Sequence, residues 1–216
     1  ATVSAGLADG KTIGQGLEEM DKIASETLDD TFRTALSGDS KDYRESSSSL
    51  MFAFILALVL IYLILAAQFE SFKDPFIIML TVPLAIAGAL IFMFAGGITM
   101  NIFSQIGIIM LIGLVAKNGI LIVEFANLKQ ESGEDKMAAI RNAALQRLRP
   151  ILMTSVSTIL GLIPLAFATG EGANQRIAMG TAVVGGMLVS TLLTMYIVPA
   201  IYTYISTNRK VKTETV

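Results

Sequence analysis

The sequence contains no cysteine and no histidine. Without cysteine the chain can form no disulfide and has no thiol nucleophile, and without histidine it lacks the usual base of a catalytic triad and most transition-metal sites. Charge is also scarce, since 16% of the 216 residues are charged and the net charge is −2. This composition gives no indication of nucleic-acid binding. These absences exclude several classes of enzyme but identify no cellular compartment.

Apolar residues are what the chain has in abundance. They make up 53% of the sequence, and the mean hydropathy is +0.65. Both values lie outside the range of soluble domains and indicate a membrane protein. The chain begins at Ala1 rather than methionine and shows no signal-peptide pattern. We therefore expect a segment of a longer chain.

The first 46 residues are polar and mixed. Apolar residues recur at helical spacing from Leu17 to Leu28, which predicts an amphipathic helix. Residues 2–5 and 31–36 suit short strands. The sequence thus predicts a β-α-β piece over 1–46, a small α+β fragment whose remaining strands lie outside this chain and which could not bury a core alone.

Five apolar segments follow, each close to the twenty residues that a helix needs to cross the hydrocarbon core. They predict an all-α polytopic membrane bundle over 47–206, with a tail at 207–216. Pro83 should kink the second span, and Pro150 should stand in the first turn of the fourth. The amphipathic residues 133–148 predict a separate helix on the membrane surface. The five predicted spans are about 48–68, 76–95, 102–125, 151–169 and 177–204.

Loop charges predict the orientation. Alternate loops and the tail carry nine lysines and arginines, against one in the other loops. The positive-inside rule then places loops 68–75 and 126–150 and the C-terminus in the cytoplasm, with the N-terminal region outside. An interfacial aromatic belt on the cytoplasmic side is predicted from Tyr62, Tyr196, Tyr202 and Tyr204.

Lys117 stands in the middle of the third span. An ammonium group at that depth costs about 2.5 to 3.5 kcal/mol on insertion scales, so such residues normally face a bundle interior and pair with carboxylates. Glu124 is two helical turns away, roughly 10 Å, and the predicted spans contain no aspartate. Either Lys117 is neutral, or its counter-charge comes from another part of the molecule. We favour the second alternative.

Asn118, Arg147 and Thr154 are further candidates. Arg147 is seven residues before Thr154, so both share one side if the helix continues through Pro150. The alternative is that Arg147 only enforces topology and that the hydroxyls bond back to their own helix. In the last span Ala182, Gly186, Ser190 and Thr194 recur at intervals of four, which predicts close helix packing.

Three runs of sequence resemble one known family. They are IGLVAKNGILIVEFAN (112–127), RLRPILMTS (147–155) and LGLIPLAFATGEG (160–172). They closely resemble the C-terminal membrane half of resistance-nodulation-division transporters, and within these the hydrophobe/amphiphile efflux pumps of Gram-negative bacteria. AAQFESFKDPF (66–76), MLTVPLAIAGAL (79–90) and the polar N-terminal region, similar to the end of a periplasmic porter domain, fit the same family.

The resemblance implies a proton-driven antiporter that exports hydrophobic and amphiphilic compounds. It implies a homotrimer in the bacterial inner membrane, with a periplasmic adaptor protein and an outer-membrane channel as partners, protons as the coupling ion and no other cofactor. It also implies a relay in which an aspartate pair of the N-terminal half engages a lysine. Lys117 matches that lysine, Arg147 and Thr154 match an arginine and a threonine nearby, and the lysine's helix would swing toward Thr154 and Asn118.

Two alternatives come from other classes. An intramembrane hydrolase would use Lys117 as the base, with Ser104 or Ser155 as the nucleophile. Ser104 is nearly 20 Å of helix from Lys117, and no oxyanion-hole motif is evident. A purely structural membrane scaffold would tolerate leucine at position 117.

Overall fold

The computed structural model of this chain describes residues 2–6, 13–29, 31–170 and 172–206. Five helical segments of 20 to 33 residues are long and apolar enough to cross a membrane, which confirms the predicted number of spans. The helices of the described residues are α1 (Ile13–Thr27), α2 (Asp39–Phe69), α3 (Lys73–Met79), α4 (Thr81–Ala95), α5 (Ile102–Glu131), α6 (Lys136–Ala166) and α7 (Ala173–Ile205).

The N-terminal region contains the predicted amphipathic helix, α1, but not the predicted strands. Residues 2–6 and 32–36 have no regular structure, and the described part of the chain contains no strand at all. The β-α-β prediction was therefore wrong for these residues, because an isolated extended segment has no neighbouring edge to pair with. α1 buries none of its residues and is joined to α2 by the ion pair between Asp21 and Arg44, at 2.8 Å.

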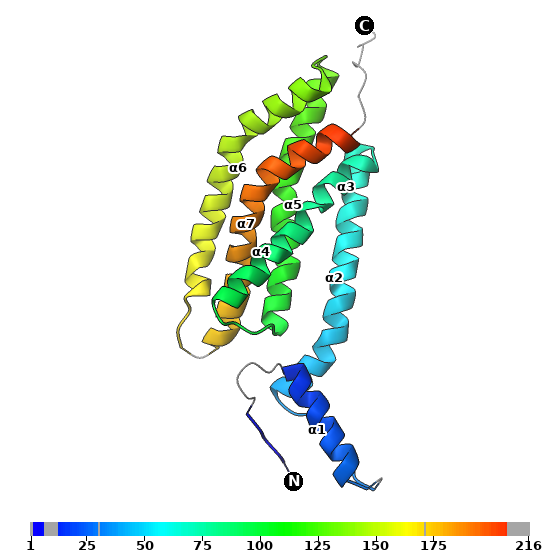
Figure 1. Cartoon of the computed structure of the whole chain (residues 1–216), viewed down its shortest axis with the longest axis vertical. Helices are drawn as coiled ribbons and strands as arrows, with labels where there is room; N and C mark the ends of the chain where they lie inside the picture. The colour runs from blue at the N-terminus through cyan, green and yellow to red at the C-terminus, as the bar shows by residue number, and fades with distance from the viewer. Residues whose placement is uncertain (1, 7–12, 30, 171, 207–216) are drawn as a thin grey trace.

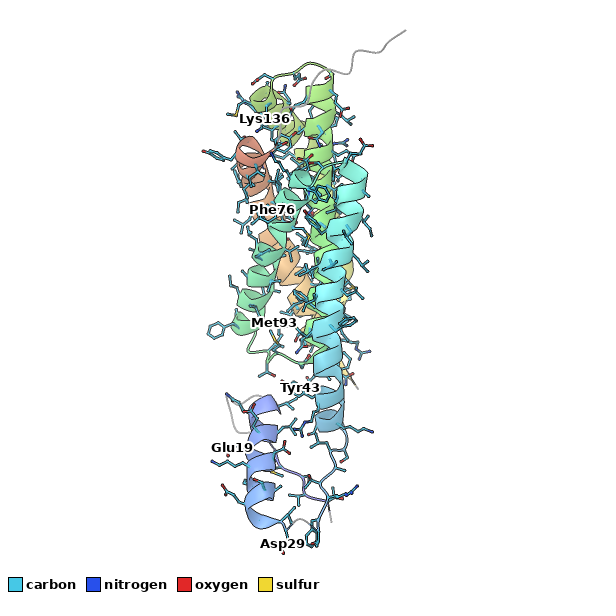
Figure 2. The ribbon with its side chains drawn as sticks, turned by 90° about the vertical axis from the view of Figure 1, so that its right-hand side faces the viewer. Glu19, Asp29, Tyr43, Phe76, Met93 and Lys136 are labelled. Carbon is cyan, nitrogen blue, oxygen red and sulfur yellow. The ribbon has the colours of Figure 1, made fainter. Side chains whose placement is uncertain are left out.

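α2 is a continuous helix of 31 residues that links the N-terminal region to the bundle. Its apolar part, Leu50–Phe69, is the first candidate span. Figure 1 shows α2 running from α1 along the whole length of the bundle. It ends where α5 and α7 also end and where α3 and α6 begin; we call this the distal end. In Figure 2, Phe76 and Lys136 are labelled toward the distal end, whereas Glu19 on α1 and Asp29 just after it lie at the opposite end of the molecule.

The second span is broken into α3 and α4 at Leu80. A proline ring clashes with the carbonyl four residues earlier, and for Pro83 that residue is Met79, the last of α3. Pro83 itself is the third residue of α4, where its missing N–H costs no helical hydrogen bond. The predicted interruption is confined to Leu80, three residues before the proline, where the backbone keeps helical angles (φ −63°, ψ −16°) and the N–H still donates to the Phe76 carbonyl at 3.2 Å.

α6 differs from the prediction of two separate helices. It is one helix of 31 residues with Pro150 and Pro164 inside it, so residues 136–148 are helical, as predicted, but continue directly into the fourth span. Their position on the membrane surface stays a prediction. Pro150 removes only the hydrogen bond to the carbonyl of Gln146, and α6 bends instead of ending, as Figure 1 shows. The buried side chains of Ile140 and Ala143 join the apolar core, which holds this part of α6 against the bundle.

α5 and α7 form the centre of the bundle. The four small residues predicted to form a packing stripe on α7 are all buried. A Cβ atom at Gly186 would collide with Leu111 of α5 and lie 2.9 Å from the carbonyl oxygen of Ala85 on α4. The prediction of close helix packing along this stripe is therefore confirmed.

Candidate functional site

α5 carries the lysine at mid-span. The helix begins with a capping box, in which Asn101 Oδ1 accepts a hydrogen bond from the Ser104 amide at 2.9 Å and the Asn101 amide donates to Ser104 Oγ at 2.9 Å. This cap fixes where the helix starts and satisfies an otherwise orphan donor. Because successive residues of a helix are about 100° apart, the start of α5 determines which side of the helix each later residue occupies.

Lys117 points out of the bundle. Its side chain is exposed, although the neighbouring residues Ala116 and Asn118 are buried. Among the described residues the structure records no hydrogen bond and no ion pair for Lys117. Glu124 on the same helix is also exposed and lines a small cavity of about 110 Å³ with residues of α2 and α5. The expectation that Lys117 faces inward among these five spans was therefore wrong.

Asn118 points inward, because consecutive residues of a helix are about 100° apart. Its Nδ2 donates to Ser155 Oγ of α6 at 3.2 Å and lies 3.4 Å from Thr191 Oγ1 of α7. Thr191 Oγ1 in turn donates to Ser155 Oγ at 3.2 Å. All three side chains are buried, so this neutral cluster, the Asn118 cluster, joins the three longest spans at mid-membrane.

Arg147 is half-buried and lies over an aromatic ring of α5. Its guanidinium carbon is 4.4 Å from the centroid of Phe125, well within cation–π distance. Lys129 Nζ lies 5.9 Å from the same centroid. The buried Nε of Arg147 has no hydrogen-bond partner among the described residues. Arg147 therefore contacts α5 at Phe125, about two turns beyond Lys117.

Thr154 is exposed and bonds back to its own helix, since its hydroxyl donates to the Ile151 carbonyl at 3.1 Å. Thr158 does the same toward Thr154, at 2.8 Å. The alternative interpretation of these hydroxyls is thus confirmed within the described bundle. No hydrogen bond or ion pair of the described residues joins Lys117, Asn118, Arg147 and Thr154 to one another.

The hydrolase alternative finds no support in this geometry. The Ser104 hydroxyl donates to the Asn101 carbonyl at 2.7 Å as part of the helix cap. The Ser155 hydroxyl belongs to the Asn118 cluster. In the part of the chain that the structure describes, neither serine is bonded to Lys117, so neither has the base that a dyad requires.

A second buried polar cluster was missed by sequence reasoning. Asp74, only 2% exposed, lies in α3, and the second span as observed begins at Lys73. The statement that the spans contain no aspartate was therefore wrong. Asp74 accepts hydrogen bonds from Asn127 Nδ2 at 3.0 Å and Ser206 Oγ at 3.3 Å. An aspartate directly before a proline at the edge of an apolar run was the available signal, because such a residue often starts a helix.

Tyr202 belongs to the same cluster. It was predicted to be an interfacial aromatic residue, but it is fully buried, whereas Tyr196 and Tyr204 are exposed. Its hydroxyl donates to Asn127 Oδ1 at 2.5 Å and accepts from Gln130 Nε2 at 2.8 Å. The interfacial position predicted for Tyr202 was wrong because the aromatic-belt rule considers only how deep a residue lies in the membrane. It does not consider which side of the helix the residue occupies.

Five long apolar helices with a lysine at mid-span define a multi-pass membrane protein whose outer face carries an intramembrane charge. Residues 1–206 match the family model described as AcrB/AcrD/AcrF family. The chain belongs to this family of resistance-nodulation-division transporters, which confirms the resemblance.

Relatives support the same assignment. The chain is 39% identical over 199 residues to the toluene efflux pump membrane transporter TtgB of Pseudomonas putida, covering 92% of this chain and 19% of TtgB. It is 40% identical over 196 residues to the multidrug resistance protein MdtF of Escherichia coli, covering 90% of this chain and 19% of MdtF. An uncharacterized transporter of Haemophilus influenzae is 38% identical over 217 residues, covering 97% of this chain and 21% of that protein. The chain thus spans about a fifth of the length of these relatives.

Proposed function

We propose that this chain is the C-terminal membrane part of a proton-driven antiporter that exports hydrophobic and amphiphilic compounds. In this proposal it contributes the lysine side of the proton relay. An N-terminal half with an aspartate pair supplies the other side. Protons are the only coupling ion, and the residues involved are Lys117, Asn118, Arg147 and Thr154.

The observation that carries the proposal is the exposed position of Lys117. A lysine on the outer face of an apolar span would meet lipid in the five helices alone, at a cost of several kcal/mol. Its position is favourable only if another part of a larger assembly covers this face and provides a counter-charge. The family's aspartate pair has that charge, and the chain's short coverage of its relatives leaves room for it.

The proposed cycle depends on that charge. Protonation of the aspartates from outside removes their attraction for Lys117, so the lysine and its helix shift. A proton crossing 100 mV supplies about 2.3 kcal/mol before the pH term, comparable with the free-energy difference between two such conformations. A shift of α5 would strain the Asn118 cluster, whose neutral hydrogen bonds of 3.2 to 3.4 Å join it to α6 and α7.

The proposed assembly is a homotrimer in the bacterial inner membrane, working with a periplasmic adaptor protein and an outer-membrane channel. Residues 1–46 would belong to its periplasmic porter region. We place the distal end in the cytoplasm because segments 68–75 and 126–150, which carry one and five lysines and arginines, and the end of α7 all lie there. The exposed apolar side chains of α2 and α6 would face lipid or the missing half.

Replacement of Lys117 tests the function. Lys117→Ala and Lys117→Arg in the complete transporter should both abolish efflux while trimer assembly persists, because a guanidinium does not replace a compact ammonium. Lys73→Ala is the matched control, since Lys73 is exposed at the end of a span and should be dispensable. Normal export by Lys117→Leu would instead support a scaffold, and labelling by a serine-directed probe would support a hydrolase.

A further inference from the structure

The Asp74 cluster is a network of buried groups at the distal end that the proposed relay does not use. It consists of Asp74 on α3, Asn127 and Gln130 on α5, and Tyr202 and Ser206 at the end of α7. Each of these residues is at most 6% exposed. A carboxylate inside a membrane span is costly and is therefore a candidate for a functional role.

Hydrogen bonds run through the cluster in one continuous chain. Gln130 donates to Tyr202, Tyr202 donates to Asn127, and Asn127 donates to Asp74, which also accepts from Ser206. Lys136 at the start of α6 donates to the carbonyl of Ser206 at 2.5 Å. The cluster therefore ties α3, α5, α6 and α7 together at one place.

The orientation of the Asn127 amide is fixed from both sides. Its Nδ2 donates to a carboxyl oxygen of Asp74, and its Oδ1 accepts from the hydroxyl of Tyr202. Reversing the amide would break both hydrogen bonds. α5 is consequently held at this end in one rotation and one depth relative to α3 and α7.

The two buried polar clusters of α5 differ in strength. The Asn118 cluster is neutral, and its distances are 3.2 to 3.4 Å. The Asp74 cluster has four hydrogen bonds, three of which are 3.0 Å or shorter, so its contacts are both more numerous and closer. Asn127 lies ten residues after Lys117, about 15 Å further along the helix. The middle of α5 can therefore separate from its neighbours at a lower cost than its distal end can.

We propose that Asp74 is a positioning residue for the transport cycle: it anchors the distal end of α5 to α3 and α7, so that the Lys117 segment moves about this fixed point. The inference rests on the proposed function. Asp74 lies outside the proposed relay and would act through its hydrogen bond with Asn127.

An exchange of the two side chains tests the anchor in the complete transporter. Asp74→Asn leaves two amides facing each other, and Asn127→Asp places two carboxylates together. Each single variant should lower the maximal efflux rate at least fivefold while KM for the exported compound changes less than twofold. The double variant Asp74→Asn/Asn127→Asp restores one carboxylate and one amide, and it should return the rate to within twofold of the wild type.

Two further measurements keep the outcomes distinct. Tyr202→Phe removes the hydroxyl that donates to Asn127 and accepts from Gln130. It should also lower the rate, so it replaces any single variant that fails to accumulate. Ser157→Ala, an exposed hydroxyl on α6, is the control. A double variant no better than the worse single variant, or single variants and Tyr202→Phe with wild-type rates, would overturn the anchor. If the anchor fails and Lys117→Ala also transports normally, the proposed function fails as well. If the anchor fails but Lys117→Ala abolishes transport, the proposed function stands without the anchor.

Discussion

The guanidinium carbon of Arg147 lies 4.4 Å from the centre of the Phe125 ring, which joins α6 to α5 at the level where α6 bends. This contact links a residue implicated by family resemblance to one that the sequence did not single out. It also explains how a half-buried arginine whose Nε lacks a hydrogen-bond partner among the described residues is held in place.

Replacement of this ring should therefore weaken the contact between α5 and α6. Phe125→Leu should lower the free energy of unfolding by about 1 kcal/mol beyond the loss of apolar surface, the size of a partly desolvated cation–π interaction. Phe125→Tyr keeps the ring and should stay close to the wild type. Thermal unfolding of the detergent-solubilised chain measures the difference. Equal stability of both variants would show that the ring contributes apolar contact but no cation–π interaction.

The Asn118 cluster makes a second prediction. Asn118→Leu removes the donor shared by Ser155 and Thr191 and leaves their buried hydroxyls with one partner fewer, which should cost about 1 to 3 kcal/mol. Ser155→Ala should cost a similar amount, because it removes the hydroxyl that accepts from both Asn118 and Thr191. Ser157→Ala, exposed on the same helix, should leave the stability unchanged. Equal unfolding transitions for Asn118→Leu and the wild type would contradict the cluster.

Gly186 tests the packing of α7 against α4 and α5. Gly186→Ala should destabilise the bundle by about 1 to 3 kcal/mol, since the added methyl group meets the Leu111 side chain and the Ala85 carbonyl oxygen. Gly161→Ala is the matched control, because nothing lies within 4 Å of its added Cβ and alanine favours the helix. Its stability should equal or slightly exceed that of the wild type.

Glu134 makes the turn between α5 and α6 sensitive to pH. Hydrogen bonds from Asn142 and then from Lys129, at 2.9 Å each, lower the pKa of its carboxyl below the usual 4.5. The unfolded chain therefore binds more protons in this range, so the stabilisation is complete above about pH 4.5 and is lost as the pH falls through the lowered pKa. The protection factors for amide exchange at residues 132–136, which correct for the intrinsic pH dependence of exchange, should fall on acidification, and Glu134→Gln should remove this dependence.

How much of the fold follows from sequence is clear from individual residues. The apolar runs predict five spans because their length is set by the bilayer. Pro83 and Pro150 show the limit of local rules: the helix is interrupted at one residue, Leu80, before Pro83, whereas it continues through Pro150 with a bend. Both prolines follow a segment packed into the core, through Ile77 and Ile78 in α3 and through Ile140 and Ala143 in α6, so core packing alone does not account for the difference. No property of the proline itself contains that information.

The candidate residues show the same limit. Hydropathy places Lys117 in the membrane, but the side of α5 that it occupies depends on which helices pack around it. Asn118 was chosen as its neighbour in sequence, and its partners Ser155 and Thr191 were not predicted because they are 37 and 73 residues away. Asp74 was missed because the predicted span started at residue 76, three residues later than the observed one.

The uninterrupted α2 has a mechanical consequence. Its 31 residues form a rod about 46 Å long, and only 6% of its apolar window is buried within the bundle. Because α2 is continuous, its end near Phe69 and its residue Tyr43, beside Gly14 of α1, belong to one helix. The bundle and the N-terminal helix are therefore joined by a single regular element and not by a loop.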